Sequence, residues 1–173
     1  MRRHPGGSLI RALRAHDAEA YAAVRRHALL EAPLAFGASP ADDFAAGPEA
    51  VREQLRRAPA WVILGAFRPA LIGAVGLFRD RRLKSAHKAH LWGMYVAPSY
   101  RREGVAAELL QAALQHARAL PRMSWVHLSV SAAAPEAQRL YERAGFRVWG
   151  TEPDALRHDG HAVVTHHMAL HLG

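Results

Sequence analysis

The segment of residues 89–119 constrains the fold of this chain more than any other. Residues 89–96 predict a strand that Pro98 ends, and residues 103–119 predict a long helix. Apolar side chains recur every three or four residues along that helix, which is the period of one face packed against a core. These side chains are Ala106, Leu109, Leu110, Ala113, Leu114 and Ala117. A strand followed directly by a packed helix predicts a strand–helix–strand unit with parallel pairing.

Further elements are predicted on both sides of this unit. Strands are expected at residues 9–13, 61–67, 71–78, 125–130, 146–150 and 162–170, and helices at 17–30, from Pro48, and between Pro135 and Gly145. The segment 31–47 is rich in Pro, Gly, Ala and Asp and is expected to be a long loop. This order predicts an α/β (α+β) fold with a mixed central sheet of about seven strands flanked by about four helices. We expect one domain over residues 9–173 and a flexible N-terminal tail over residues 1–8.

Composition narrows the class of protein. The 173 residues suit a single domain, and the absence of cysteine excludes disulfides and thiolate chemistry. No segment has the roughly 18 consecutive apolar residues of a membrane helix, and no signal peptide is apparent, so we expect a cytoplasmic protein without membrane partners. The formal charge of +8 favours an anionic partner. The arginines are scattered in pairs without interleaved aromatics, so solvated faces are favoured over nucleic-acid binding.

A phosphate site is predicted between the strand and the long helix. The loop reads Arg101-Arg102-Glu103-Gly104-Val105-Ala106. The first turn of a helix has unpaired N–H groups and the positive end of the helix dipole. Gly104 and Ala106 leave these amides open, so they could cradle a pyrophosphate, with the two arginines adding positive charge. The alternative is a plain strand-to-helix connection with a solvated arginine pair.

Two motifs in this part of the chain resemble one family. The first is Arg/Gln-x-x-Gly-x-Gly/Ala after a strand that ends in Tyr-Val-x-Pro, here residues 95–106. The second is Leu-Tyr-x-x-x-Gly-Phe, here Leu140 to Phe146. In this order and spacing they resemble the motifs of the GNAT superfamily of acyl-CoA N-acyltransferases. The resemblance in sequence motifs covers residues 89–150, and the part of the chain before residue 89 resembles the family only in its expected fold.

The resemblance implies a binding site for acetyl-CoA as the acyl donor and no metal. The pantetheine arm would bond the backbone of Met94 and Val96 in a cleft where two strands part. The resemblance assigns the pyrophosphate to Arg101, Arg102, Glu103, Gly104, Val105 and Ala106. Gly93 could permit a bulge beside the cleft, or simply allow close packing. Tyr141 stands where the family often has a general acid, which would protonate the leaving thiolate; the alternative is an ordinary packed aromatic.

The sequence offers several candidates for the general base. His90 occupies a strand position where some relatives place a glutamate, and histidine titrates near neutrality. Glu31, Asp42 and Asp43 are rival bases, and ordered water is another. Relatives often have Asn seven residues before the tyrosine, where this chain has Ala134. One cofactor contact is therefore expected to be missing, and Ser131 lies nearby in the sequence.

Other chemistries find little support. Among the C-terminal histidines, His166 and His167 are adjacent, so a strand would direct them to opposite faces, and no metal-binding spacing occurs. The serines lack the G-x-S-x-G elbow of a nucleophile, and no Gly-Lys-Ser/Thr or G-x-G-x-x-G motif is present. Trp92 and Tyr95 are expected on opposite faces of their strand, most simply as core aromatics.

The sequence therefore predicts an N-acetyltransferase that moves an acetyl group from acetyl-CoA to a primary amine by direct attack. Tyr141 is the expected acid and His90 a candidate base. The acceptor is an amine of unknown identity, on a small molecule or a protein, and the enzyme is expected to be a monomer or homodimer. One alternative is a non-catalytic acyl-CoA-binding module, suggested by Ala134. Another is a basic protein associated with nucleic acid.

Overall fold

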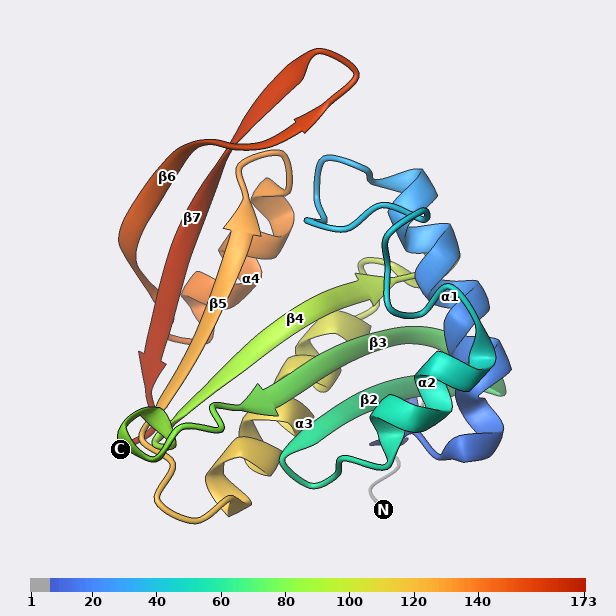
Figure 1. Ribbon diagram of the computed structural model, residues 1–173, viewed down its shortest axis with the longest axis horizontal. Helices are drawn as coiled ribbons and strands as arrows, with labels where there is room; N and C mark the ends of the chain where they lie inside the picture. The colour runs from blue at the N-terminus through green and yellow to red at the C-terminus, as the bar shows by residue number, and fades with distance from the viewer. Residues whose placement is uncertain (1–6) are drawn as a thin grey trace.

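The computed structural model describes residues 7–173, and its centre is a seven-stranded sheet with the strand order β1-β2-β3-β4-β5-β7-β6 (Figure 1). The strands are β1 (Leu9–Ala12), β2 (Trp61–Arg68), β3 (Ala70–Arg79), β4 (Lys88–Val96), β5 (Trp125–Ser131), β6 (Arg147–His158) and β7 (His161–His171). The main helices are α1 (Ala18–Glu31), α2 (Pro48–Leu55), α3 (Val105–Ala119) and α4 (Pro135–Arg143). The predicted order and number of strands and long helices are confirmed.

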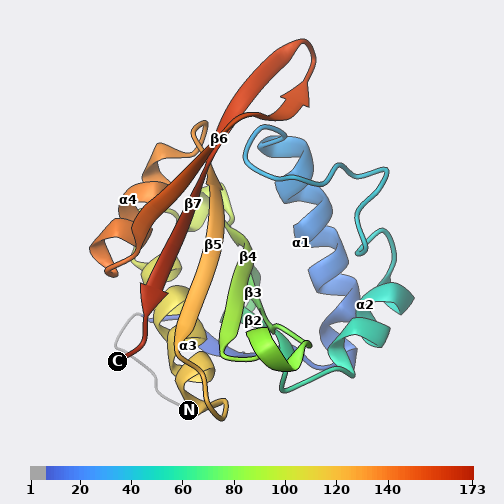
Figure 2. The same ribbon diagram turned by 60° about the vertical axis from the view of Figure 1, so that its left-hand side comes forward.

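The helices cover the two faces of the sheet unequally. Seen along the sheet, α1 and α2 lie on one side and α3 and α4 on the other (Figure 2). The larger core lies under α3 and α4 and includes Leu109, Leu110, Val126 and Met168. A smaller core lies under α1 and α2, over strands β2 to β4. The outer face of β5, β7 and β6 on the α1 side is therefore left without a helix.

The sheet splits between β4 and β5. These strands pair in parallel through only three residue pairs, the last of which joins His90 to His127. Beyond His127, β5 continues in antiparallel pairing with β7, where Ser129 is opposite His167. The edge of β4 from Leu91 onward therefore faces an opening in the sheet.

A β-bulge at Gly93 shapes the wall of this opening. Gly93 has φ +62°, and the pairing of β3 with β4 shifts by one residue there. The predicted bulge is confirmed. The prediction that Trp92 and Tyr95 lie on opposite faces is wrong. The bulge adds one residue between them, so both side chains lie on the same face of the strand. Trp92 packs with Phe44 of the smaller core, and the Tyr95 ring lies beside His27 of α1.

Two boundaries differ from the prediction. Helix α3 begins at Val105 rather than residue 103, because Arg102 and Gly104 adopt φ of +65° and +84°. Strand β6 extends to His158, well beyond residue 150, through pairing with β7 that is interrupted between Glu152 and Leu156. Its polar sequence gave no strand signal, because long-range pairing rather than local propensity makes this segment extended.

Residues 1–6 of the expected tail lie outside the described residues. Ser8 is buried, and its hydroxyl accepts a hydrogen bond of 2.9 Å from Nε of Arg68. Across residues 7–173, no helix combines the length and apolar character needed to cross a membrane.

Candidate active site

The opening beside β4 exposes unpaired backbone groups. The N–H of Ala97 donates to the carbonyl of Ile72 on β3 (2.8 Å), so the alternation of the strand turns Val96 and Met94 the other way, toward the opening. The carbonyl of Val96 accepts a hydrogen bond of 2.9 Å from Nε of Arg101. The remaining groups of Met94 and Val96 are placed to pair with an extended ligand, as one more strand would.

The start of α3 lies at the end of this wall and presents open amides. The first N–H that bonds within the helix is that of Glu108, which donates to the carbonyl of Gly104 (3.0 Å), so the preceding amides have no helical partner. A Cβ built on Gly104 would meet no atom within 4 Å. The space above these amides is therefore empty, and the residues present fit the phosphate cradle that the sequence predicts.

Two of the three charged side chains of the loop, those of Arg101 and Glu103, are committed to other contacts. Nη2 of Arg101 donates to Oε2 of Glu31 (2.8 Å), which also accepts from the hydroxyl of Tyr95 (2.6 Å). These bonds, first that from Arg101, lower the pKa of Glu31, while burial and the bond to Glu31 raise the pKa of Tyr95. Glu103 forms an ion pair with Arg68. Arg101 thus ties the loop to the C-terminal end of α1, and Arg102 is exposed at the rim.

Tyr141 lies on α4, next to the segment that follows β5. It is 7% exposed and packs edge-on against Phe146, with ring centroids 5.9 Å apart. Burial alone raises the pKa of its hydroxyl, which keeps the proton on the phenol at neutral pH. Ala134 is the residue before α4, and Ser131 does not replace the expected Asn, since its hydroxyl donates to the carbonyl of Leu34 (2.6 Å).

His90 lies where β4 and β5 still pair, at the closed end of the opening. Its ring stacks on Phe78, with centroids 4.8 Å apart, and Nε2 lies 3.1 Å from Oδ1 of Asp80 but outside hydrogen-bond geometry. The next ring along the face is His127, whose pKa is lowered by burial and then by the neighbouring His90. Strand β4 therefore holds His90 beside the split, close to a carboxylate that it does not hydrogen-bond.

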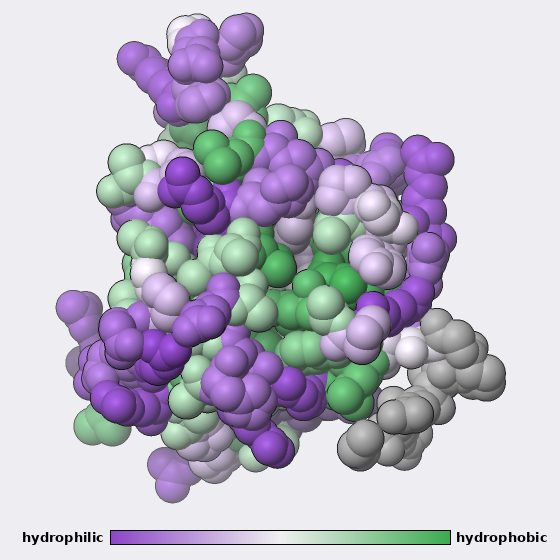
Figure 3. Space-filling view, turned by 90° about the vertical axis from the view of Figure 1, so that its right-hand side faces the viewer, coloured by the Kyte–Doolittle hydropathy of each residue, from purple (hydrophilic) through white to green (hydrophobic). Residues whose placement is uncertain are grey.

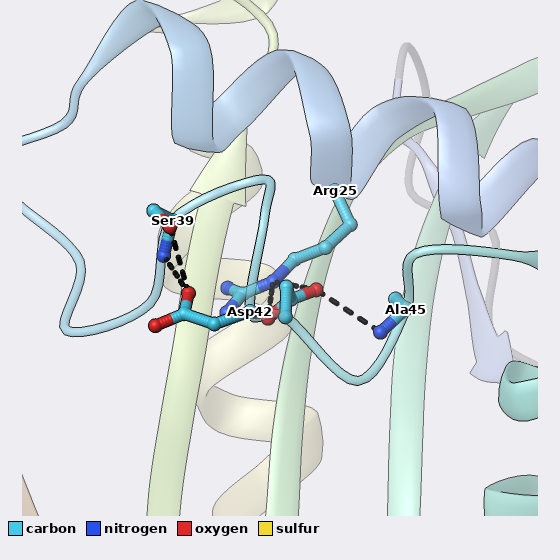
Figure 4. Close-up of polar contacts among 5 residues, drawn as sticks. Arg25, Ser39, Asp42 and Ala45 are labelled. Carbon is cyan, nitrogen blue, oxygen red and sulfur yellow. Dashed lines mark hydrogen bonds and ion pairs between the residues drawn. The ribbon is translucent and has the colours of Figure 1, made fainter.

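Two of the rival bases, Asp42 and Asp43, are engaged in the segment between α1 and α2 (Figure 4). Asp43 is buried and forms an ion pair of 2.8 Å with Arg25 of α1, and it also accepts from the N–H of Ala45 (3.1 Å). Asp42 accepts from both the N–H and the hydroxyl of Ser39 (2.6 and 2.8 Å), which lowers its pKa. Both carboxylates therefore stabilise the conformation of the segment, and neither is available as an unpaired base.

A cavity of about 440 Å³ lies between this segment and the tip of the β6–β7 hairpin. Its walls include Leu29, Phe36, Pro40, Asp42, Leu156 and His158. On the face formed by α1, α2 and the segment between them, hydrophobic side chains gather in a central hollow surrounded by hydrophilic ones (Figure 3). The lining of the cavity mixes apolar side chains, such as Leu29, Phe36 and Leu156, with the charged Asp42 and Arg157.

Sequence reasoning missed one polar row, formed by Ser129, His167 and Glu152. Oγ of Ser129 lies 2.8 Å from Nδ1 of His167, and Nε2 of His167 lies 3.0 Å from Oε2 of Glu152. The alternation of β5 and β7 places Ser129 and His167 outward, but only the register between these strands brings them together. Over the described residues, no three His, Asp or Glu side chains gather as a metal site.

Comparison with known proteins identifies the fold and the family. The sequence model of the Acetyltransferase (GNAT) family matches residues 12–146. No curated protein matches the sequence. Among solved structures, a GNAT-family acetyltransferase from Streptococcus pneumoniae has a TM-score of 0.83 at 22% identity, covering 95% of this chain and 99% of its own.

Two further structures share the fold at low identity. The ribosomal-protein-alanine N-acetyltransferase from Brucella melitensis has a TM-score of 0.81 at 19% identity, covering 94% of this chain and 99% of its own. A GNAT superfamily phosphinothricin acetyltransferase from Sinorhizobium meliloti, solved in complex with acetyl-CoA, has a TM-score of 0.82 at 20% identity, covering 96% of this chain and 89% of its own.

Proposed function

Because the chain belongs to the GNAT family of acetyltransferases, we propose that it transfers an acetyl group from acetyl-CoA to a primary amine by direct attack. The observation that carries the proposal is that two sets of backbone groups without hydrogen-bond partners lie next to each other. The edge of β4 at Met94 and Val96 has no neighbouring strand, and the bare amides at the start of α3 follow it. An extended ligand with an anionic end would pair with the edge of β4 and bind the amides of α3. CoA is such a ligand, since its pantetheine arm is joined to a pyrophosphate.

In this proposal each part of the site has one task. The open amides around Gly104 bind the pyrophosphate, and Met94 and Val96 hold the arm. Backbone N–H groups of β4 at the bulge polarise the thioester carbonyl as negative charge develops on its oxygen. Tyr141 keeps its proton at neutral pH and gives it to the departing thiolate. With no cysteine in the chain, no thiol intermediate forms on the protein.

The acceptor reaches the split through the cavity between the α1–α2 segment and the β6–β7 hairpin. His90, at the closed end of the split, is one proposed base for the amine. The similarity to the phosphinothricin and ribosomal-protein-alanine acetyltransferases supports an amine acceptor, on a small molecule or on a protein. The identities of 20% and 19% do not choose between them.

The test is thiol release from acetyl-CoA over a panel of amino acids, polyamines, peptide N-termini and lysine peptides, with calorimetric titration of CoA. We expect binding of CoA and turnover of at least one amine. Binding without turnover of any amine would instead support the non-catalytic acyl-CoA-binding module, and no binding would refute both.

Tyr141→Phe tests the acid assignment. We expect kcat to fall by about 10²-fold or more, because the variant keeps the buried ring and loses the proton that the thiolate needs. The affinity for CoA should hardly change. Tyr21→Phe is the matched control, since Tyr21 is also buried (2% exposed) but lies in the smaller core under α1. Equal activities of the two variants would reject Tyr141 as the acid.

A further inference from the structure

The row of Ser129, His167 and Glu152 holds an imidazole in a fixed position. Strand register sets Ser129 directly opposite His167, and the two outer bonds of the ring measure 2.8 and 3.0 Å. Trp149 of β6 stacks on the ring, with centroids 5.5 Å apart and planes 29° apart. Two hydrogen bonds and one aromatic face therefore fix both the position and the rotation of His167.

The hydrogen-bonding capacity of the three groups determines where the proton lies. An ionised carboxylate only accepts, so Glu152 requires that Nε2 of a neutral His167 carry the hydrogen. Nδ1 is then an acceptor, and the hydroxyl of Ser129 must donate to it. The lone pairs of Ser129 Oγ remain unused, and this residue is exposed. The hydroxyl oxygen of Ser129 can therefore accept a hydrogen bond from a ligand. His167, which accepts the Ser129 hydroxyl hydrogen at Nδ1, can act as the base that takes this proton.

This open end lies at the split in the sheet. Ser129 is the first outward-facing residue of β5 after its last pair with β4, at His127. Its neighbours Leu128 and Val130 point into the core under α3 and α4, so Ser129 faces the side on which no helix covers β5. Tyr141 belongs to that core. The proposed acid and the open hydroxyl therefore lie on opposite sides of the sheet.

We propose that Ser129, His167 and Glu152 form a proton relay that deprotonates the acceptor amine, with Ser129 in contact with the amine and the other two as positioning residues. The inference rests on the proposed acetyltransferase function and assigns the base of that reaction. His90 is less well placed, since it sits where the strands still pair and no hydrogen bond orients its Nε2.

The relay moves one proton from the acceptor amine to His167 by way of Ser129. The ammonium form of the acceptor gives a proton to Ser129 Oγ as the hydroxyl proton passes to Nδ1 of His167. The free amine attacks the thioester carbon, the C–N bond forms, and the C–S bond breaks on collapse. Tyr141 protonates the thiolate and regains a proton from the attacking nitrogen. His167, cationic and stabilised by Glu152, releases its proton to water.

The ionisable groups around His167 are few. Glu152 approaches from β6 and His127 lies on β5, beside the ring of Trp149. His90 and Asp80 lie one ring further along the face. His166, next in the chain, points to the other face, where its Nδ1 lies 3.1 Å from Oγ1 of Thr151. It is therefore a matched control on the same strand.

The kinetic test compares variants on the amine of the panel with the highest kcat/KM. We expect Ser129→Ala and His167→Gln each to lower kcat/KM at pH 7 by about 10²-fold, within the range of general base catalysis. The deficit should shrink as pH rises toward the pKa of the amine, because the amine then loses its proton unaided. Ser129→Thr should restore activity, and His166→Gln should stay within about twofold of the parent.

Two results would overturn the relay in this experiment. One is a deficit independent of pH, or equal to that of His166→Gln, which would indicate a merely structural role. The other is an acetyl group on Ser129 in the intact mass of rapidly quenched enzyme, which would make Ser129 a nucleophile. Binding of CoA should be unchanged in every variant, which separates a failed relay from a failed cofactor site.

A second measurement needs no acceptor. In the complex with CoA, ¹⁵N–¹H correlation spectra of His167 should show the hydrogen on Nε2 at neutral pH, and Glu152→Gln should weaken that preference. A hydrogen on Nδ1 would refute the relay. If no amine turned over, the proposed function would fail, while these spectra would still decide whether the hydrogen-bonded relay exists.

Discussion

Gly104→Ala separates binding at the start of α3 from the stability of the fold. Gly104 has φ +84°, and a Cβ there would meet no protein atom within 4 Å. The cost in the free protein is therefore the left-handed backbone alone, about 1–2 kcal/mol. The methyl group would, however, stand in the space above the open amides, where the pyrophosphate is proposed to lie.

The loss in affinity follows from the bonds displaced. Hydrogen bonds to a charged group contribute about 1.5–3 kcal/mol each, so losing one would weaken CoA binding by about 10- to 100-fold. Gly160→Ala is the matched control, because Gly160 has φ +79° and also meets nothing within 4 Å, but lies in the turn between β6 and β7. It should destabilise the protein about as much and leave CoA affinity unchanged.

The assay is calorimetric titration with CoA and with pantetheine, beside urea unfolding of each variant. Pantetheine lacks the pyrophosphate, so Gly104→Ala should bind it as the parent protein does. The reasoning would be refuted by equal losses of CoA affinity in the Gly104 and Gly160 variants. An equal loss for CoA and pantetheine would show that the methyl group acts on the arm and not on the phosphates.

Two predictions concern buried charge. Asp43→Ala should lower the free energy of unfolding in urea by about 3–5 kcal/mol, because it leaves the buried guanidinium of Arg25 without its partner; the double variant Arg25→Met, Asp43→Leu should be markedly less destabilised. Hydrogen bonding to Arg11 lowers the pKa of Asp17, so their pair stabilises the fold above the unfolded-state pKa of about 3.9 and loses this contribution as pH falls through the lower folded-state pKa. Arg11→Met should therefore flatten the fall of the unfolding midpoint in acid, and an unchanged acid profile would contradict this.

The sequence predicts local features of this fold well. The period of α3, the bulge at Gly93 and the open amides at Gly104 all follow from residues close together in the chain. The extension of β6 to His158 did not, because its strand structure comes from pairing with β7. The shared face of Trp92 and Tyr95 was not predicted, because regular alternation of side chains along the strand was assumed across the bulge at Gly93.

Contacts between distant residues lay beyond prediction for a different reason. Glu31 and Arg101 are 70 residues apart, and Ser129 and His167 are 38 apart. Neither pair has a local motif, and each depends on which strands and helices become neighbours. His90 was located correctly on its strand, but the contacts that join Ser129, His167 and Glu152 could not be predicted.

The short pairing of β4 with β5 gives the protein an edge strand inside its own sheet. Such edges attract other extended chains, and proteins usually protect them with charge, twist or a covering segment. Here the protection would come from the proposed CoA arm and from the α1–α2 segment, which Ser131 holds through the carbonyl of Leu34. The ligand-free protein should consequently be the form that exchanges the amide hydrogens of Met94 and Val96 fastest and aggregates most readily.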